Sequence, residues 1–221
     1  MKLLAIDTAT EACSAALLHN DEILRRYQVA PRQHTALILE MVDSLLAETN
    51  LTLDDLDALA FGRGPGAFTG VRIAAGVIQG LAYGADLPVI PVSTLAALAQ
   101  DVAAKHTHII SAIDARMGEI YWCVFETDAA GLVHAVTEEK VSRPEDLQLT
   151  SGHQYFGVGS GWVKYKSVLQ IQLGDQLVGM SGELFPNAAN IIVLARTEMQ
   201  KGHLLTAAEA LPAYIRNKVT G

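Results

Sequence analysis

The segment from Phe61 to Gly84 limits the choice of fold more than any other part of the chain. Its first residues, FGRGPGAF, form a turn in which proline fixes one backbone angle and glycine permits conformations that other residues avoid. Apolar side chains then recur about one helical turn apart, from Val71 to Leu81. We therefore expect a strand end, a rigid turn and a helix, in that order.

Two interpretations of this segment are open. Gly64 and Gly66 precede the expected helix, and the free N–H groups of a helix N-terminus attract anions, which favours a phosphate site. Gly76 and Gly80 instead share one face of the helix, and Gly84 falls at its end. Each interior glycine lowers helix stability by about 1 kcal/mol relative to alanine. The presence of two such glycines therefore favours a surface against which another backbone packs closely.

Composition excludes several classes of protein. Of the 221 residues, 50% are hydrophobic, but the longest apolar region, Val71 to Ala99, is interrupted by polar residues and is not expected to span a membrane. The N-terminus starts an expected strand and shows no secretory signal, so a cytoplasmic location is expected. The net charge of −8 disfavours independent binding of nucleic acid. Cys13 and Cys123 lie in apolar runs and are expected to be buried free thiols.

Residues 1–105 are expected to form one α/β subdomain, with three antiparallel strands followed by alternating helices and strands. The expected strands are Leu3–Asp7, Cys13–His19, Glu22–Val29, Asp57–Gly62 and Leu87–Val92. The expected helices are Pro31–Glu48, residues 67–83 and Ser93–Lys105, with a short turn at Leu53–Leu56. The polar stretch at residues 103–108 is the expected boundary.

The helix expected at Pro31–Glu48 has more apolar positions than one buried face requires. One stripe, with Ile38, Val42 and Leu45, can face the sheet. A second stripe is formed by His34, Leu37 and Met41. This stripe indicates either a surface for a partner or burial within a larger core.

Residues 106–221 begin with the same pattern as the N-terminus. A strand at Ile109–Ile113 ends in Asp114, a turn follows, and Glu119–Phe125 is a second strand. GVGSGW at residues 157–162 is a second glycine turn, and Asn187–Gln200 is expected to be helical. The pattern indicates a weak internal duplication, with a reduced second subdomain.

Five motifs, in order, resemble those of the TsaB (YeaZ) family: AIDTATEACSAAL, PRQHT, GRGPGAFTGVRIAAGVIQGLAYG, PVSTL and IDARMGEIYW, with a terminal YIRN. The resemblance implies an actin/Hsp70-like fold of two RNase H-like α/β subdomains with mixed sheets. It also implies a non-catalytic scaffold subunit that supports a TsaD-type catalytic subunit, together with a TsaE-type ATPase. That complex forms threonylcarbamoyladenosine beside the tRNA anticodon.

The resemblance further implies where sites should lie. The expected partner interface contains His34, Leu37, Met41, Val71, Gly76 and Gly80. The same surface is expected to form a homodimer when the chain is alone. A vestigial phosphate turn is expected at Asp7, Thr8, Gly64, Gly66 and Asp114. No cofactor is expected in the isolated chain, ATP or ADP would bind only in the assembled complex, and tRNA only indirectly.

One departure from the related TsaD proteins bears on catalysis. TsaD holds a metal with two histidines four residues apart, and Thr94 and Leu98 stand at the corresponding positions here. Leucine cannot bind a metal and threonine is a poor ligand, so no metal site is expected. The alternative function is an ATPase or glycopeptidase-like hydrolase of the actin fold, in which Asp7 and Asp114 would act as a carboxylate pair.

Two smaller groups have ordinary structural interpretations. His106 and His108 lie on the polar junction, with no carboxylate or cysteine nearby to complete a ligand set, and are expected in a solvated loop. Arg116 and Glu119 flank the turn after Asp114 and are expected to form a hairpin ion pair or part of an interface.

Overall fold

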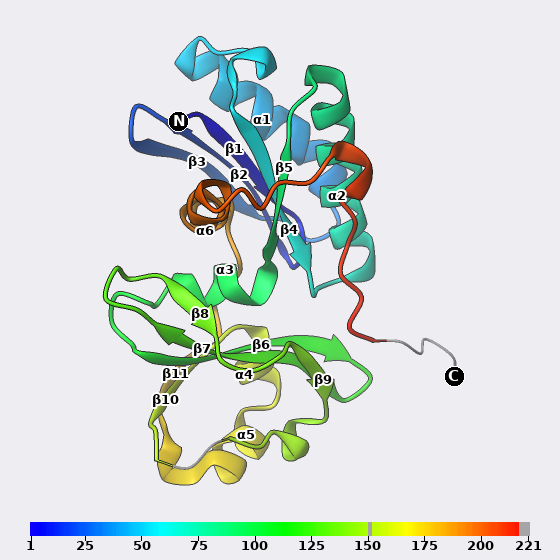
Figure 1. Ribbon diagram of the computed structural model, residues 1–221. Coiled ribbons are helices and arrows are strands. Elements are labelled where there is room, and N and C mark those ends of the chain that lie inside the picture. Colours follow the sequence, from blue (N-terminus) through cyan, green and yellow to red (C-terminus); the bar gives the residue numbers. More distant parts are fainter. Residues whose placement is uncertain (150–151, 217–221) are drawn as a thin grey trace. The chain divides into compact units, whose positions relative to one another are not determined.

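The computed structural model describes residues 1–149 and 152–216, and the chain folds as two compact units (Figure 1). The first unit contains Met1–Ala97 and Pro186–Ala213, and the second contains Leu98–Phe185 and the C-terminal segment from Tyr214. The boundary thus lies before the expected stretch at residues 103–108. The chain also returns to the first unit near its end, which the two-part division of the sequence did not anticipate.

The first unit is built on a five-stranded mixed sheet with the strand order β3-β2-β1-β4-β5 (Figure 1). The strands are β1 Leu3–Asp7, β2 Ala12–His19, β3 Glu22–Val29, β4 Ala58–Gly64 and β5 Val89–Ser93. β1, β2 and β3 are antiparallel neighbours, as expected for the N-terminal meander. β4 and β5 continue the sheet in parallel from β1. This mixture of directions confirms the expected class of sheet.

Helices cover both faces of this sheet. α1 (His34–Thr49) and α2 (Phe68–Ala85) lie on one face, and α6 (Ala188–Gln200) lies on the other (Figure 1). The two cores follow the alternation of side chains along β1, since Leu4 and Ile6 pack toward α1 and α2, whereas Leu3 and Ala5 pack toward α6. Short 3₁₀ turns occur at η1 (Leu53–Asp55) and η4 (Ala207–Glu209).

Two helix ends differ from the sequence expectation. α1 begins at His34 and not at Pro31, because Arg32 has a φ of 68°, which is incompatible with a right-handed helix. α3 (Thr94–Gln100) stops before the expected Lys105, and the chain continues in turns over residues 101–105. α1 itself ends in the left-handed residue Asn50, whose N–H bonds to the carbonyl of Ala47.

The second unit repeats the arrangement of the first. Its sheet has the order β11-β10-β6-β7-β8, and β9 pairs separately with β7. The strands are β6 His108–Arg116, β7 Glu119–Thr127, β8 Val133–Ala135, β9 Lys140–Ser142, β10 Tyr155–Val158 and β11 Leu177–Ser181. β6 pairs antiparallel with β7 and parallel with β10, just as β1 does with β2 and β4. The duplication therefore extends well beyond the first hairpin.

The helical elements of the second unit are short. They are α4 Ser160–Lys164, α5 Lys166–Leu173, η2 Pro144–Asp146 and η3 Gly174–Gln176. The glycine turn GVGSGW joins β10 to α4, as β4 is joined to α2. Over the described part of the chain, no helix has the length and apolarity needed to cross a membrane.

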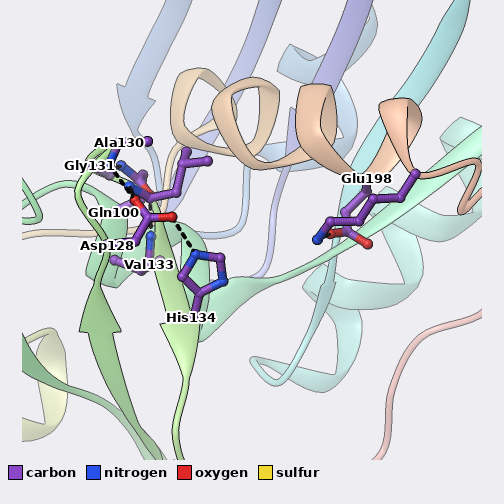
Figure 2. Close-up of polar contacts among 9 residues, drawn as sticks. Gln100, Asp128, Ala130, Gly131, Val133, His134 and Glu198 are labelled. Atoms are coloured by element: carbon purple, nitrogen blue, oxygen red, sulfur yellow. Dashed lines mark hydrogen bonds and ion pairs between the residues drawn. The ribbon is translucent and has the colours of Figure 1, made fainter.

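A side chain from α3 holds the turn between β7 and β8 (Figure 2). Gln100 donates from Nε2 to the carbonyl of Gly131 at 2.7 Å and accepts at Oε1 from the N–H of Val133 at 3.1 Å. Within the turn, Asp128 accepts from the backbone N–H of Ala130 at 2.8 Å and contacts His134 at 2.7 Å. The side-chain amide of Gln100 therefore satisfies the hydrogen-bonding capacity of two backbone groups at the start of the short strand β8.

Candidate functional site: the glycine turn and the helix pair

The glycine turn is packed tightly against the loop after β1. The Thr8 hydroxyl donates to the carbonyl of Gly70 at 2.7 Å, and the N–H of Ala67 donates to the carbonyl of Ala9 at 2.8 Å. Ala67 is the N-cap of α2, so this N–H group, which has no acceptor within the helix, is already used. The Gly64–Pro65 peptide bond is cis.

Three glycines are required by this packing. A Cβ added at Gly62 would overlap a carboxylate oxygen of Asp7. One at Gly66 would overlap the carbonyl oxygen of Ala9, and one at Gly70 would overlap that of Thr8. These glycines therefore let the chain approach itself. Residues 7–9 occupy the space beside these three glycines.

Asp7 is fully buried at the end of β1. One carboxylate oxygen accepts from the N–H of Ala9 at 3.0 Å, and the other has no hydrogen-bond partner in the described structure. Burial raises the pKa of Asp7 to about 7, against the opposing effect of the Ala9 hydrogen bond. A substantial fraction of this carboxyl is therefore protonated near neutral pH. Burial, followed by the charge of Asp7, also raises the pKa of Cys13 to about 11.

Asp114 occupies the corresponding place in the second unit but has a different environment. Its carboxylate accepts from Lys164 Nζ at 2.8 Å and from the Tyr165 hydroxyl at 3.1 Å, and Arg116 lies 3.2 Å away. Burial acts to raise the pKa of Asp114, but the hydrogen bonds from Lys164, the Arg116 backbone and Tyr165 outweigh it and hold the pKa below its usual range. Asp114 is thus a charged, fully engaged carboxylate.

Arg116 and Glu119 were expected to form a hairpin ion pair or part of an interface, and both take part in ion pairs with other residues. Arg116 pairs with Asp114, while Glu119 pairs with Arg216 from the C-terminal segment. Arg116 has a φ of 61°, in the left-handed turn that reverses the chain after Asp114. The expected terminal motif YIRN is described as far as Arg216, and Asn217 lies outside the described residues.

Thr94 and Leu98 stand at the two positions where TsaD proteins have metal-binding histidines. Thr94 is buried, and its hydroxyl oxygen accepts from the N–H of Gly64 at 3.1 Å. Leu98 is also buried. Within residues 1–149 and 152–216, no group of three or more histidine, cysteine or acidic side chains is arranged to hold a metal ion.

His106 lies in the loop before β6, where a solvated loop was expected, but is half-buried, whereas His108 is the first residue of β6. His106 stacks on Phe156 with ring centroids 3.8 Å apart, and His108 lies 4.3 Å from the His153 ring. The parallel pairing of β10 with β6 places these rings together, a long-range contact that local sequence does not indicate.

The second set of glycines in α2 is different in kind. Gly76, Gly80 and Gly84 are exposed, and a Cβ added at any of them would meet no atom within 4 Å. Packing within the described chain therefore does not explain their four-residue spacing. The same helix exposes Tyr83, which is 86% accessible.

Four other expected interface residues are less accessible than the glycines. His34 is 8% exposed and Val71 is 2% exposed, so neither presents its side chain on the surface of the isolated chain. Leu37 and Met41 are half-buried against the core of the first unit. The exposed apolar residue of α1 is Leu39, at 47%, which the sequence did not single out.

The second apolar stripe of α1 has a partner inside the chain. Arg26 of β3 donates to the Ser44 hydroxyl at 3.0 Å and forms an ion pair with Glu48. Ser44 is one turn beyond Met41 and two turns beyond Leu37, so this face of α1 is turned toward the edge strand. The C-terminal half of this face of α1 therefore contacts β3.

Sequence comparison identifies relatives over nearly the whole chain. A family model described as TsaD, tRNA N6-adenosine threonylcarbamoyltransferase, matches residues 19–215. The tRNA threonylcarbamoyladenosine biosynthesis protein TsaB of Escherichia coli (strain K12) is 43% identical, over 99% of this chain and 96% of its own length. The chain belongs to the TsaB (YeaZ) family.

Further relatives of this family agree in sequence and in fold. The TsaB protein of Haemophilus influenzae is 41% identical over 100% of this chain and 95% of its own length. The structure of YeaZ from Pseudomonas aeruginosa is 42% identical and superimposes with a TM-score of 0.90, covering 96% of this chain and 99% of that one. The family resemblance and the fold of two actin-like α/β units are confirmed.

Proposed function

We propose that this chain is an accessory subunit in the biosynthesis of threonylcarbamoyladenosine in tRNA, where it binds and supports a TsaD-type catalytic subunit. The observation that carries the proposal is the near full-length similarity to relatives named as TsaB proteins of this pathway. The further partners under this proposal are a TsaE-type ATPase and, through the complex only, tRNA. The chain would act in the cytoplasm, where tRNA is processed.

The surface we assign to the TsaD-type partner is the exposed side of α1 and α2. Gly76 and Gly80 leave a shallow trough in α2, because their missing side chains are not replaced by other atoms of the chain. A partner helix can therefore approach the α2 backbone closely at these residues, which increases van der Waals contact. Leu39 of α1 is 47% exposed and adds apolar area to the side of this helix that faces solvent.

Two features support a non-catalytic role. Asp7 is buried and partly protonated near neutral pH, so it is poorly suited to hold a divalent cation. The N-cap N–H of α2 is bonded to Ala9, and residues 7–9 occupy the room beside Gly62, Gly66 and Gly70. These contacts favour the view that the phosphate turn is vestigial. Under this proposal, ATP or ADP binds only within the assembled complex.

The test is co-purification with a TsaD-type subunit. Gly76→Arg and Gly80→Arg add a long charged side chain where the chain has open space, so both variants should fold normally and fail to bind. Gln170→Arg on the exposed surface of α5 is the matched control and should bind like the wild type. Charges at Leu37 or Met41 are less informative, because both side chains also contact the core.

The outcomes separate the two parts of the proposal. Binding that survives both glycine variants would show that the surface is wrongly assigned. No binding of the wild type to any TsaD-type subunit would refute the accessory role. The same surface should form a homodimer in the absence of the partner, since a two-fold contact between apolar helices is self-complementary. Light scattering should then show a dimer for the wild type and a monomer for Gly76→Arg.

The alternative is an ATPase or glycopeptidase-like hydrolase, favoured by the retention of Asp7 at the end of β1. Calorimetric titration of ATP and Mg²⁺ into the isolated chain separates the two functions. The accessory role predicts no binding heat. Micromolar binding that Asp7→Ala abolishes would instead establish a nucleotide site in this chain.

A further inference from the structure

The second unit has a pocket of ≈ 390 Å³ that no feature described above uses. Trp122 of β7 and Lys140 and Ser142 of β9 contribute to its lining, together with Glu139 just before β9. Asp146 comes from η2, and Ile215 comes from the C-terminal segment. The pocket therefore combines an aromatic ring, an aliphatic side chain and charges of both signs.

The polar groups of Trp122 and Ser142 are already satisfied. Trp122 is 3% exposed, and its indole N–H donates to the Ser142 hydroxyl oxygen at 2.9 Å. The Ser142 hydroxyl in turn donates to the carbonyl of Arg143 at 3.0 Å. Because Trp122 is almost fully buried, a ligand meets aliphatic surface from Val141 and Ile215 and little of the ring, and its polar groups must be recognised by the charged residues of the lining or by Gln148.

The charged residues favour a cation. Glu139 and Asp146 place two carboxylates against the single ammonium of Lys140. The Lys140 ammonium lies 5.4 Å from the centre of the Trp122 ring, so one cation is already held over the indole. An anionic ligand would meet more like charge than opposite charge in this lining.

The adjacent residue of β7 shows the same recognition within the chain. Arg216 lies 6.0 Å from the Tyr121 ring and pairs with Glu119, and its side chain is only 15% exposed. The C-terminal segment that carries Arg216 also supplies Ile215 to the pocket. A basic side chain, an aromatic ring of β7 and a glutamate thus form one favourable group within the chain, on the opposite face of β7 from Trp122.

We propose that the pocket binds a basic side chain, lysine or arginine, presented by an extended segment of a partner protein. The aliphatic stem of that side chain packs beside Ile215 and Val141, and its charged end lies between Glu139 and Asp146. Lys140 competes for the same position, because it places its own ammonium over the indole. This proposal does not depend on the assignment of the α1 and α2 surface.

The test follows the indole N–H resonance of Trp122 by NMR while the full chain is titrated with the peptide acetyl-Val-Arg-Val-amide at low ionic strength. The resonance should shift in a saturable way, and the peptides with glutamine or glutamate in place of arginine should give no such shift. The only other tryptophan, Trp162, is fully buried and donates to the carbonyl of Ile110, so its resonance is an internal reference.

Substitutions in the pocket should act in opposite directions. Glu139→Gln combined with Asp146→Asn should weaken arginine-peptide binding by about tenfold, at roughly two- to fivefold for each carboxylate. Lys140→Gln should strengthen binding by about two- to fivefold, because it removes the competing cation. The control pair Asp175→Asn and Glu183→Gln makes the same change of charge outside the pocket and should leave binding unchanged.

Each contrary result is decisive. A shift with inorganic phosphate that Lys140→Gln abolishes would show an anion site. Equal shifts with spermidine and with the arginine peptide would show a site for free polyamines and not for a protein segment. Absence of a saturable shift with the arginine peptide would refute the proposal, provided that thermal unfolding shows each variant to be folded.

Discussion

Gly70 and Gly76 of α2 should respond in opposite ways to the same substitution by alanine. Gly70 is buried, and a Cβ placed there would overlap the carbonyl oxygen of Thr8. Gly76 is exposed, and a Cβ there would meet no atom within 4 Å. Gly76 lies in the interior of α2 and Gly70 in its first turn, so the gain in helix propensity from alanine is no larger at Gly70 than at Gly76.

The magnitudes follow from these surroundings. In a helix interior, alanine is favoured over glycine by about 1 kcal/mol, and at Gly76 nothing opposes this gain. Gly76→Ala should therefore raise the free energy of unfolding by about 1 kcal/mol. At Gly70, overpacking costs about 1–3 kcal/mol, and disturbing the bond from the Thr8 hydroxyl to the Gly70 carbonyl costs about 1 kcal/mol more. Gly70→Ala should therefore lower the free energy of unfolding by about 1–3 kcal/mol after the helix gain.

Urea unfolding of the two variants and the wild type, followed by circular dichroism, gives the comparison directly. Gly76→Ala has a second consequence under the proposed function, because a methyl group in the trough should weaken binding of a TsaD-type subunit while the isolated chain becomes more stable. If Gly70→Ala is as stable as Gly76→Ala, the tight approach of the loop after β1 to α2 is wrong. If Gly76→Ala is destabilising, the open face of α2 is wrong.

Two further predictions concern charged groups. The folded-state pKa of Asp7, about 7, lies above its ordinary value of 3.8, so the folded state favours the protonated carboxyl. The contribution of this protonated carboxyl to the free energy of unfolding is complete below about pH 4, falls as the pH rises and is lost above about pH 8. The difference in free energy of unfolding between the wild type and Asp7→Asn should therefore change by up to about 4 kcal/mol across this range, and a flat difference would contradict the raised pKa. For the pair of Glu119 and Arg216, a double-mutant cycle with Glu119→Gln and Arg216→Met should give a coupling of about 0.5–1 kcal/mol, and zero coupling would show that the pair does not hold the C-terminal segment.

Much of the architecture could be predicted because local sequence patterns determine many of its helices, strands and turns. The meander of β1 to β3, the helix pair and the turn into α2 follow from periodicity, glycine and proline, and their expected bounds differ little from those observed. Asp114 at the end of an apolar strand predicted the start of the repeat. Local sequence patterns did not indicate where the last helix, α6, packs. α6 joins the first unit because Leu3 and Ala5 need a cover on the second face of the sheet, a requirement visible only once the sheet exists.

The site shows the same limit at the level of single residues. The spacing of glycines in α2 was correctly recognised, but sequence could not show that Gly66 and Gly70 face their own chain while Gly76 and Gly80 face open space. The apolar stripe on α1 was ambiguous for a similar reason. The contact that explains part of it, from Arg26 to Ser44 and Glu48, joins residues that are distant in sequence and are brought together by β3.

The two units share one topology yet use the aspartate at the end of the first strand differently. Asp114 is charged and engaged by Lys164 and Tyr165, whereas Asp7 is buried with one oxygen unpartnered. A cation-dependent site needs ionised carboxylates that a ligand can reach. Asp114 meets the first condition but its oxygens are occupied, and Asp7 meets neither fully near neutral pH. The repeat therefore gives its two copies of this aspartate different environments, one charged and engaged and the other buried and partly protonated near neutral pH, which supports the accessory role proposed above.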